Sequence, residues 1–358
     1  MNYKETLFFI AKSLTISFEE KNRDEIEFIL KTTDVDWDTV VKVSTSHFVF
    51  PAIYCNFKRA DFLKYLPADL VEYMRHLTDL NRDRNTQIIQ QAQELNSLLL
   101  ANNITPIFLK GTGNLLAGIY EDIAERMVGD IDFIFSKEDY PKAIEILENE
   151  KYYSDKEFLK FFRHYPRLTN TSKIAAVEIH NKVLNKPYSA ILSFEKINKD
   201  AQLFSNIKVA SIGNKLLNSV LPKQINDNLY YSKTICLRTV YDVFLLFKKS
   251  NGLLPKTNNQ KVDKRFNNFI GCVNFLLKIK DLNNFKETNS SKKYLYNYIS
   301  VLNKSKKEEL KIHVLNIFVR FKDQLNILLF SFTSRDYREH SWNRLTSMAF
   351  YKRRFGVK

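Results

Sequence analysis

The sequence predicts an α+β protein in which a small mixed β-sheet is flanked by helical regions. Three observations support this fold class. Apolar residues fall at helical spacing between about residues 61 and 102, they alternate with polar residues in two short middle runs, and helical spacing returns beyond Ile212. We expect an N-terminal helical region (1–102), an α/β core (103–211) and a basic C-terminal helical domain (212–358).

Two alternating runs in the core predict strands. In GDIDFIFS, Ile131 and Phe133 alternate with Asp130 and Asp132, and AAVEIHNKV (175–183) alternates in the same way. Two adjacent strands of this kind would bring their polar faces together. The chemistry of the protein is therefore expected in the core.

Helices and loops are expected around these strands. The short apolar run ITPIFLKG (104–111) precedes a segment whose apolar residues share a helical face (Leu115, Leu116, Ile119 and Tyr120). Ser136 with Asp139 resembles the capping box of a further helix. In the C-terminal domain, the polar segments 251–268 and 281–293 are expected to be loops.

Composition excludes several protein classes. The chain has 358 residues, of which 44% are hydrophobic and 27% charged, as in ordinary globular proteins rather than disordered, collagenous or disulfide-rich ones. Its apolar runs are far shorter than the roughly 20 residues that span a bilayer, and the N-terminus lacks a secretion signal. With only three widely spaced cysteines, Cys55, Cys236 and Cys272, we expect a cytoplasmic protein without a membrane segment.

Positive charge is concentrated in the last part of the chain. Residues 1–100 hold 12 basic and 15 acidic side chains, residues 101–200 hold 14 and 15, and residues 201–358 hold 29 and 10. Such an excess attracts polyanions, because each phosphate that Lys or Arg neutralises releases a counterion. The alternative is a solubilising surface produced by coding bias, although bias alone would load all three parts alike. We therefore favour a phosphate-bearing partner.

Asp130 and Asp132 carry the main chemical signal. As residues i and i+2 of a strand they point to the same face, about 6 to 7 Å apart along the strand. A cation relieves their repulsion, and Mg²⁺ prefers hard oxygen ligands together with substrate phosphates. The alternative is a solvated strand face, which is the commoner explanation for a bare pair of this kind.

The segment Lys110-Gly111-Thr112-Gly113 stands upstream, where a strand ends and a helix opens. Glycine permits close approach of a ligand to the backbone, free N–H groups favour phosphate, and Lys110 adds a positive charge. The spacing is not that of a P-loop. The segment therefore indicates a phosphate contact only in combination with the carboxylates.

Taken together, FLKG, LLAGIY, the arginine four residues before DIDFIF, and AAVEIHNKVL resemble bacterial nucleotidyltransferases often described as uncharacterised, a branch of the DNA polymerase beta-like superfamily. SHFVFPAIYCNF, RNTQIIQQAQELNSLLL and LRTVYDVFLL are similar to the flanking parts of that family, so the resemblance extends from about Ser46 to Lys249. It implies a small mixed sheet on which a glycine turn and strand carboxylates hold Mg²⁺, as a two-metal site, and a nucleoside triphosphate.

The resemblance implies roles for individual residues. Asp130 and Asp132 match the metal-binding pair, and Glu178 stands where a third carboxylate is expected. Gly111 matches the turn glycine, although the turn KGTG and the long gap from Gly111 to Asp130 depart from the wider superfamily. These departures concern the phosphate contacts more than the metal site.

The remaining nucleotide contacts follow from the same comparison. Lys110, Gly111 and Thr112 would cradle the triphosphate, and Arg126 matches the family arginine that could neutralise the developing pyrophosphate. The alternative for Arg126 is a salt bridge to a nearby acid (Glu121, Asp122 or Glu125).

His180 shares the face of Glu178, and His164 lies upstream in FFRHYPRL; both resemble histidines of the family. Either could orient a water, act as a base or contact the nucleotide. The alternative is a core histidine bonded to a backbone carbonyl. Asp242 lies one helical turn after Arg238, so a structural i,i+4 pair is its leading explanation, with closure of the cleft as the alternative.

We therefore predict an Mg²⁺-dependent enzyme that moves a nucleoside monophosphate from an NTP, such as ATP, to an acceptor and releases pyrophosphate. RNA or tRNA fits the basic C-terminal half, and a small molecule fits the habits of the superfamily. The alternative is a non-catalytic nucleotide- or RNA-binding module that keeps the fold. The basic tail Arg335–Lys358 could dock on the body of the protein or on an anionic partner. C-terminal aromatic residues could stack bases, although such residues are more often core residues (Phe266, Phe269, Tyr294, Tyr296 and Tyr298).

Overall fold

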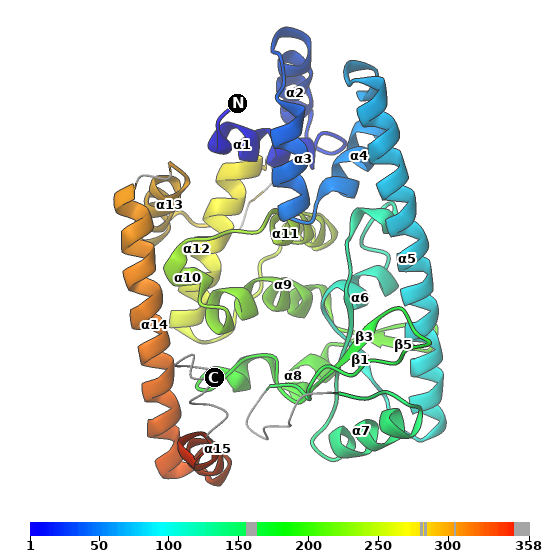
Figure 1. Ribbon diagram of the computed structural model, residues 1–358, viewed down its shortest axis with the longest axis vertical. Helices are drawn as coiled ribbons and strands as arrows, with labels where there is room; N and C mark the ends of the chain where they lie inside the picture. Colours follow the sequence, from blue (N-terminus) through cyan, green and yellow to red (C-terminus); the bar gives the residue numbers. More distant parts are fainter. Residues whose placement is uncertain (155–162, 280–281, 283–284, 304–305, 347–358) are drawn as a thin grey trace, which may run out of the picture.

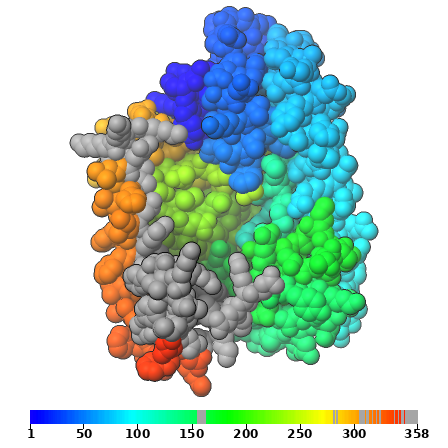
Figure 2. Space-filling view, viewed as in Figure 1, coloured from blue at the N-terminus to red at the C-terminus, as the bar shows by residue number. Residues whose placement is uncertain are grey.

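The computed structural model describes residues 1–154, 163–279, 282, 285–303 and 306–346. N-terminal helices lie at the top of the molecule, the long helix α5 runs down one side, and the sheet lies beside the lower half of α5 (Figure 1). Helix α14 runs down the opposite side, where Figure 2 shows it as one edge of the surface. The fold is α+β, as predicted.

Helices alone form the N-terminal region. Helix α1 begins after Asn2, whose side chain accepts a hydrogen bond from the backbone N–H of Glu5, while the Glu5 carboxylate accepts one from Asn2. The helical spacing between residues 61 and 102 corresponds to α5, as predicted. The elements are α1 (Tyr3–Ser13), α2 (Glu20–Thr32), α3 (Trp37–Ser46), α4 (Phe50–Arg59), the 3₁₀ turn η1 (Leu63–Tyr65) and α5 (Ala68–Ala101).

A mixed sheet of five strands forms the core, in the order β3-β2-β1-β5-β4. Strands β2 and β3 are parallel, as are β1 and β5, whereas β1 and β2, and β4 and β5, are antiparallel. Both predicted strands are present as β2 and β3. The strands are β1 (Ile107–Phe108), β2 (Asp130–Ile134), β3 (Ala176–His180), β4 (Gln202–Phe204) and β5 (Ile207–Val209).

Short helices connect these strands. The hydroxyl of Ser136 accepts a hydrogen bond from the N–H of Asp139 at the start of α7, which is one of the two bonds of the predicted capping box. The residue at the N-cap of α7 is nevertheless Glu138, which forms no side-chain cap. The predicted helix through Ile119 and Tyr120 is wrong, because the chain leaves the helix at Leu116 and Gly118 takes a left-handed φ of +60°. The connecting elements are α6 (Lys110–Leu116), η2 (Ile123–Glu125), α7 (Asp139–Asn149), η3 (Ser189–Leu192) and α8 (Phe194–Lys199).

One face of the sheet is apolar and packed. Ile131, Phe133, Val177 and Ile179 are fully buried, and the Phe133 ring packs against Phe108 of β1. Because side chains alternate along a strand, the acidic residues of β2 and β3 lie on the opposite face. Packing of the apolar face therefore fixes where the carboxylates point.

Helices of the C-terminal region pack against the core through α9. The predicted loops 251–268 and 281–293 are partly wrong: Asn259 caps α12, which begins at Gln260, and Thr288 caps α13, which begins at Asn289. The elements are α9 (Ile212–Leu221), the π-helical turn η4 (Pro222–Asn226), α10 (Leu229–Ser232), α11 (Leu237–Lys249), α12 (Gln260–Leu277), α13 (Asn289–Leu302), α14 (Lys306–Thr333) and α15 (Arg335–Thr346).

Most of the aromatic residues proposed for base stacking are instead core residues. Tyr296 is 74% exposed, whereas the other four are buried (Phe266, Phe269, Tyr294 and Tyr298). Trp342 in the predicted tail is exposed, and residues 347–358 of that tail lie outside the described residues. Within the part of the chain described here, no helix is both long and apolar enough to cross a membrane.

Candidate active site

The pairing of β2 and β3 brings the predicted carboxylates side by side. Asp132 of β2 lies opposite Glu178 of β3, and Ile134 lies opposite His180. Since residues two apart on a strand share a face, Glu178 and His180 point to the side that Asp132 occupies. The third carboxylate therefore comes from the neighbouring strand, where the sequence placed it.

Asp132, Glu178 and His180 form a compact cluster. The His180 Nε2 lies 2.8 Å from Asp132 Oδ1 and 3.5 Å from Glu178 Oε2. One potential ligand atom from each residue lies within 4.8 Å of the others. Two carboxylates and an imidazole are donor types that bind divalent metal ions, so this donor set fits one. His180 Nδ1 is buried and makes no hydrogen bond with any described residue.

The ammonium group of Lys110 lies among the same three side chains. Its Nζ is 2.5 Å from Asp132 Oδ1, 3.2 Å from Glu178 Oε2 and 3.4 Å from His180 Nε2. Burial opposes the charge of Lys110, but Asp132 and then Glu178 raise the pKa of this lysine above its usual value. Lys110 has a left-handed φ of 49°, which is uncommon outside glycine. The cluster thus surrounds a position where positive charge is stable.

Burial and hydrogen bonding also act on Glu178. Burial alone would raise the pKa of its carboxyl, but the hydrogen bond from His180 and the charge of Lys110 hold that pKa well below its usual range. For His164, whose ring packs edge-on against the His180 ring, burial lowers the pKa. Glu178 is therefore ionised across the physiological pH range, as a metal ligand must be.

Asp130 lies at the mouth of the site and has different contacts. Its carboxylate forms an ion pair with the guanidinium of Arg167. Its backbone carbonyl accepts a hydrogen bond of 2.7 Å from the hydroxyl of Thr112. Thr112 is fully buried, so its side chain holds the start of β2 in place. The compact cluster therefore contains His180 in addition to Asp132 and Glu178, and Asp130 stands beside it.

Two glycines lie near the cluster, and the space for a side chain is smaller at Gly113 than at Gly111. A Cβ atom on Gly113 would lie 2.7 Å from the carbonyl oxygen of Phe108 in β1, which is too close. At Gly111 a Cβ atom would meet the Val128 side chain at 3.0 Å and Arg126 at 3.4 Å. Close packing of α6 on β1 explains the glycine at 113, and Gly111 itself borders the site.

The cluster opens into a cleft of about 320 Å³ between the sheet and the C-terminal helices. One wall carries Lys110, Gly111, Asp130, Asp132 and Glu178. Across from them, α9, η4 and α11 contribute polar and charged residues, including Asn218, Lys223, Arg238 and Asp242. The helices after residue 211 thus complete the cleft.

Arg126 and Asp242 meet at the back of this cleft. Arg126 Nε lies 2.9 Å from Asp242 Oδ1, both side chains are largely buried, and Tyr120 donates a hydrogen bond to the same carboxylate. Burial opposes the charge of Arg126, but Asp242 raises the pKa of the guanidinium above its usual value. The predicted pair of Asp242 with Arg238 is wrong, since Arg238 instead donates to the backbone carbonyl of Met127.

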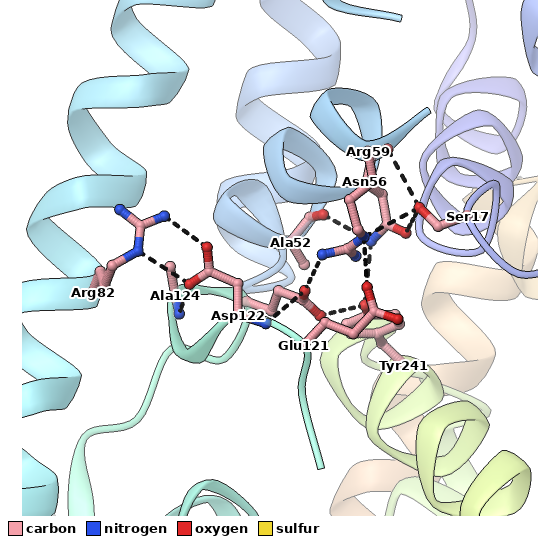
Figure 3. A network of polar contacts seen from close by, with 10 residues as sticks. Ser17, Ala52, Asn56, Arg59, Arg82, Glu121, Asp122, Ala124 and Tyr241 are labelled. Carbon is pink, nitrogen blue, oxygen red and sulfur yellow. Dashed lines mark hydrogen bonds and ion pairs between the residues drawn. The ribbon is translucent and has the colours of Figure 1, made fainter. Parts of the chain in front are cut away.

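The acids predicted as alternative partners of Arg126 bind other arginines. Arg59 pairs with Glu121 at 3.1 Å and with Glu125, and Arg82 pairs with Asp122 at 2.7 Å (Figure 3). The hydroxyl of Tyr241 donates to Glu125. These contacts tie the loop before β2 to α4, α5 and α11. The alternative salt bridge for Arg126 is therefore wrong as well.

Sequence reasoning missed three cationic residues of the cleft, namely Arg163, Lys223 and Arg238. Within the described residues, none of the three forms an ion pair with a carboxylate. They come from the loop before β3, from η4 and from α11. The concentration of basic residues after residue 200 was the only sequence signal for two of them.

Comparison with known proteins agrees with this geometry. A family model described as uncharacterised nucleotidyltransferase matches residues 33–278, which include the whole sheet and the Lys110, Asp132 and Glu178 cluster. Neither the curated proteins nor the solved structures gave a match. Since the match covers more than half of the chain, the protein belongs to the uncharacterised nucleotidyltransferase family and is a nucleotidyltransferase.

Proposed function

We propose that this nucleotidyltransferase moves a nucleoside monophosphate from a nucleoside triphosphate to an acceptor hydroxyl and depends on a divalent metal ion, with Mg²⁺ as the physiological ion. The observation that carries the proposal is the cluster of Asp132, Glu178 and His180 around a stabilised positive charge. The two carboxylates of this cluster suit a metal ion, and the cations of the same cleft that form no ion pair suit an anionic substrate. Together they suit a nucleotide that binds with its metal ion.

Asp132 and Glu178 would hold the metal ion, with His180 completing the protein ligands. When bound, the ion would withdraw charge from the phosphates and favour loss of a proton from the acceptor. Lys110 lies within reach of the same oxygens, so its ammonium group must give way to the metal. From the cluster it would then contact the phosphates beside Gly111.

The triphosphate side of the cleft is assigned to the cations that have no carboxylate partner. Lys223 and Arg238 line the wall across from the cluster, and Arg163 lines the cleft from the loop before β3. Arginine can form two parallel hydrogen bonds to phosphate oxygens, and lysine supplies a compact charge. Arg126, already bound by Asp242, would hold the back of the cleft rather than make a free phosphate contact.

The transfer would proceed in line. The acceptor oxygen forms a bond to the α-phosphorus, the bond between the α-phosphorus and its bridging oxygen to the β-phosphate breaks, and pyrophosphate leaves. Asp130 is the most exposed of the three carboxylates, with 29% of its side chain accessible. It is therefore the best placed to accept the proton of the incoming hydroxyl.

Incubation with α-labelled NTPs, Mg²⁺ and a cell extract tests the proposal. Asp132→Asn keeps the shape of the side chain but removes a ligand charge, so we expect labelling to fall by at least about 10³-fold. Glu145→Gln, an exposed acid on α7, serves as the matched control and should label as the unaltered protein does.

Two outcomes would contradict the proposal. Labelling that survives Asp132→Asn would place the metal site elsewhere. Calorimetric titration that finds NTP binding without Mg²⁺, together with no labelling by the unaltered protein, would support the non-catalytic binding module instead.

A further inference from the structure

A second cavity, of about 410 Å³, lies on the other side of η4 from the cleft. Ile225 and Asn226 of η4 line this cavity, while Pro222 and Lys223 of the same turn line the cleft. We name it the Lys186 groove after the first of its cations. Its main lining residues are Lys186, Tyr188, Tyr231, Arg265, Lys322 and Phe330.

We propose that the Lys186 groove binds single-stranded RNA and that this RNA is the acceptor. The inference rests on the proposed function, because it names the substrate whose terminal hydroxyl would enter the cleft. Several parts of the chain build the groove: the segment after β3, η4 and the turn after it, α10, α12, α14 and α15. None of its residues belongs to the metal cluster.

The first support is uncompensated positive charge. Of the described residues that line the groove, three are cations, Lys186, Arg265 and Lys322, and none is acidic. These three also form no ion pair elsewhere with the described part of the chain. Arg265 and Lys322 belong to the region with 29 basic against 10 acidic residues, and Lys186 precedes that region. A site of this kind favours a polyanion, because binding releases counterions.

The second support is the arrangement of aromatic rings beside those cations. Arg265 lies over Tyr188 and Tyr231, with its Cζ 5.7 Å and 5.6 Å from the ring centres. Lys186 lies 5.9 Å from the Phe330 ring centre, and Lys322 lies 5.4 Å from that of Tyr231. Aromatic rings interleaved with Lys and Arg are the surface that single strands use, since bases stack while phosphates meet charge.

The concave shape of the groove favours a single strand over a duplex. Tyr188, Tyr231 and Arg265 are only partly exposed, whereas Lys186 and Lys322 are exposed at its rim. Helix α14 closes one side through Asn326, Ile327 and Phe330. A duplex would present its phosphates on a wide convex surface and keep its bases stacked inside, out of reach of Tyr188 and Tyr231. A strand with unstacked bases can enter.

The position of η4 connects the groove with the proposed transfer. This turn of five residues separates the two cavities, so a strand bound beside Asn226 needs to pass only one turn of helix to reach Lys223 and the cleft. The terminal hydroxyl of that strand would then be the acceptor oxygen. The groove would thereby select the acceptor while the cleft carries out the chemistry.

Fluorescence anisotropy with a labelled oligouridylate, without NTP or metal, tests the groove by itself. Lys186→Met with Lys322→Met should weaken binding by on the order of tenfold and lower the slope of log Kd against log salt by about 1.4, since each phosphate contact of a single strand contributes about 0.7. Tyr231→Leu should weaken binding by about 5- to 100-fold through lost stacking. Lys186→Met alone leaves α14 intact and serves if the double variant unfolds.

Matched controls separate the groove from general attraction. Lys137→Met with Lys142→Met removes the same charge near α7 and should leave the affinity within about twofold, because distant surface charges are screened. Equal losses in both double variants, equal affinity for a duplex of the same length, or no binding at all would overturn the proposal.

The labelling assay separates this inference from the proposed function. If Asp132→Asn binds the oligouridylate normally but transfers nothing to it, both proposals stand. If the groove variants still label a small molecule of the extract as the unaltered protein does, the chain is a nucleotidyltransferase but RNA is not its acceptor. If Asp132→Asn labels RNA, the proposed metal site fails while the groove stands.

Discussion

The cleft at β2 and β3 and the Lys186 groove both contain several cations, but the two regions compensate this charge differently. In the cleft, Lys110 contacts the carboxylates of Asp132 and Glu178, and Arg126 contacts that of Asp242. These two cations are therefore fixed by carboxylates of the protein itself, whereas Arg163, Lys223 and Arg238 of the same cleft form no ion pair within the described residues and are left for the substrate.

In the groove, aromatic rings take the place of the carboxylates. Lys186, Arg265 and Lys322 lie over rings that cannot cancel their charge. The comparison teaches that compensation decides which ligand each region takes. A charge that the protein already neutralises holds the site in shape, whereas a charge left over attracts an anion.

Breaking the buried ion pair between Arg126 and Asp242 at the back of the cleft should have the largest effect on stability. Asp242→Asn can still accept the hydrogen bond from Tyr120 through its amide oxygen. It removes the charge and one of the two oxygens that accept from Arg126 Nε, so the guanidinium stays buried without a carboxylate. We expect the free energy of unfolding to fall by about 3 to 5 kcal/mol. Denaturant unfolding followed by circular dichroism measures it.

The control is an exposed ion pair. Glu72→Gln breaks the pair of Glu72 with Arg75, whose side chains are 76% and 58% exposed, and should change the free energy of unfolding by at most about 0.5 kcal/mol. Equal losses in the two variants would mean that burial of the Arg126 pair does not set its contribution.

The carboxylates of the cluster and the Arg126–Asp242 ion pair show what the sequence could predict and what it could not. Asp132 and Glu178 could be placed on one face because alternation along two strands fixes where side chains point, and the two strands are neighbours. Arg126 and Asp242 lie 116 residues apart, and the pairing depends on how α11 packs against the loop before β2. No local spacing encodes that packing, so the local alternatives for both residues were wrong.

The Lys186 groove and the antiparallel pair of β4 and β5 also lack a local sequence pattern that could predict them. The groove residues come from several separate segments, so the only sequence signal was the excess of basic residues, and that excess covers Arg265 and Lys322 but not Lys186. Strand β4 is exposed throughout, so it has no buried face to detect, and β5 alternates over only its three residues, which is too short to predict a strand. The fold class and the carboxylates were predictable because they depend on short-range periodicity.

A buried lysine that has no carboxylate partner within the described residues tests the comparison in a third setting. Lys215 of α9 is 2% exposed, its Nζ makes no hydrogen bond with any described residue, and burial lowers its pKa to about 8. Because the folded state binds this proton more weakly than the unfolded state, stability should rise as pH rises from 8 towards the usual lysine pKa of 10.5. Lys215→Met should therefore stabilise the protein by about 3 kcal/mol at pH 7.

The pH dependence distinguishes charge from packing at Lys215. The gain from Lys215→Met should shrink above pH 8 and largely vanish near pH 10.5, and Lys142→Met on the surface should show no such change. A gain of the same size at pH 7 and pH 10 would mean that the methionine simply packs better.

The charge of Lys110 is neutralised by Asp132 and Glu178, but under the proposed function Lys110 must leave these two carboxylates when a metal ion binds to them. Lys110→Met leaves Asp132 and Glu178 facing each other without a cation, so we expect the free energy of unfolding to fall by about 2 kcal/mol in the absence of metal, less than for a fully buried pair because 29% of the Lys110 side chain is exposed. Added Mg²⁺ should restore much of this loss.

Metal and nucleotide should respond to Lys110→Met with opposite signs. Without a competing ammonium group, Mn²⁺ as a spectroscopic probe should bind about tenfold more tightly, which corresponds to about 1.4 kcal/mol. NTP affinity should fall, because a phosphate contact is lost. Electron paramagnetic resonance titration measures the first and calorimetry the second. Weaker Mn²⁺ binding by Lys110→Met would show that lysine and metal do not share one position, and the cleft would then hold its cation somewhere other than between β2 and β3.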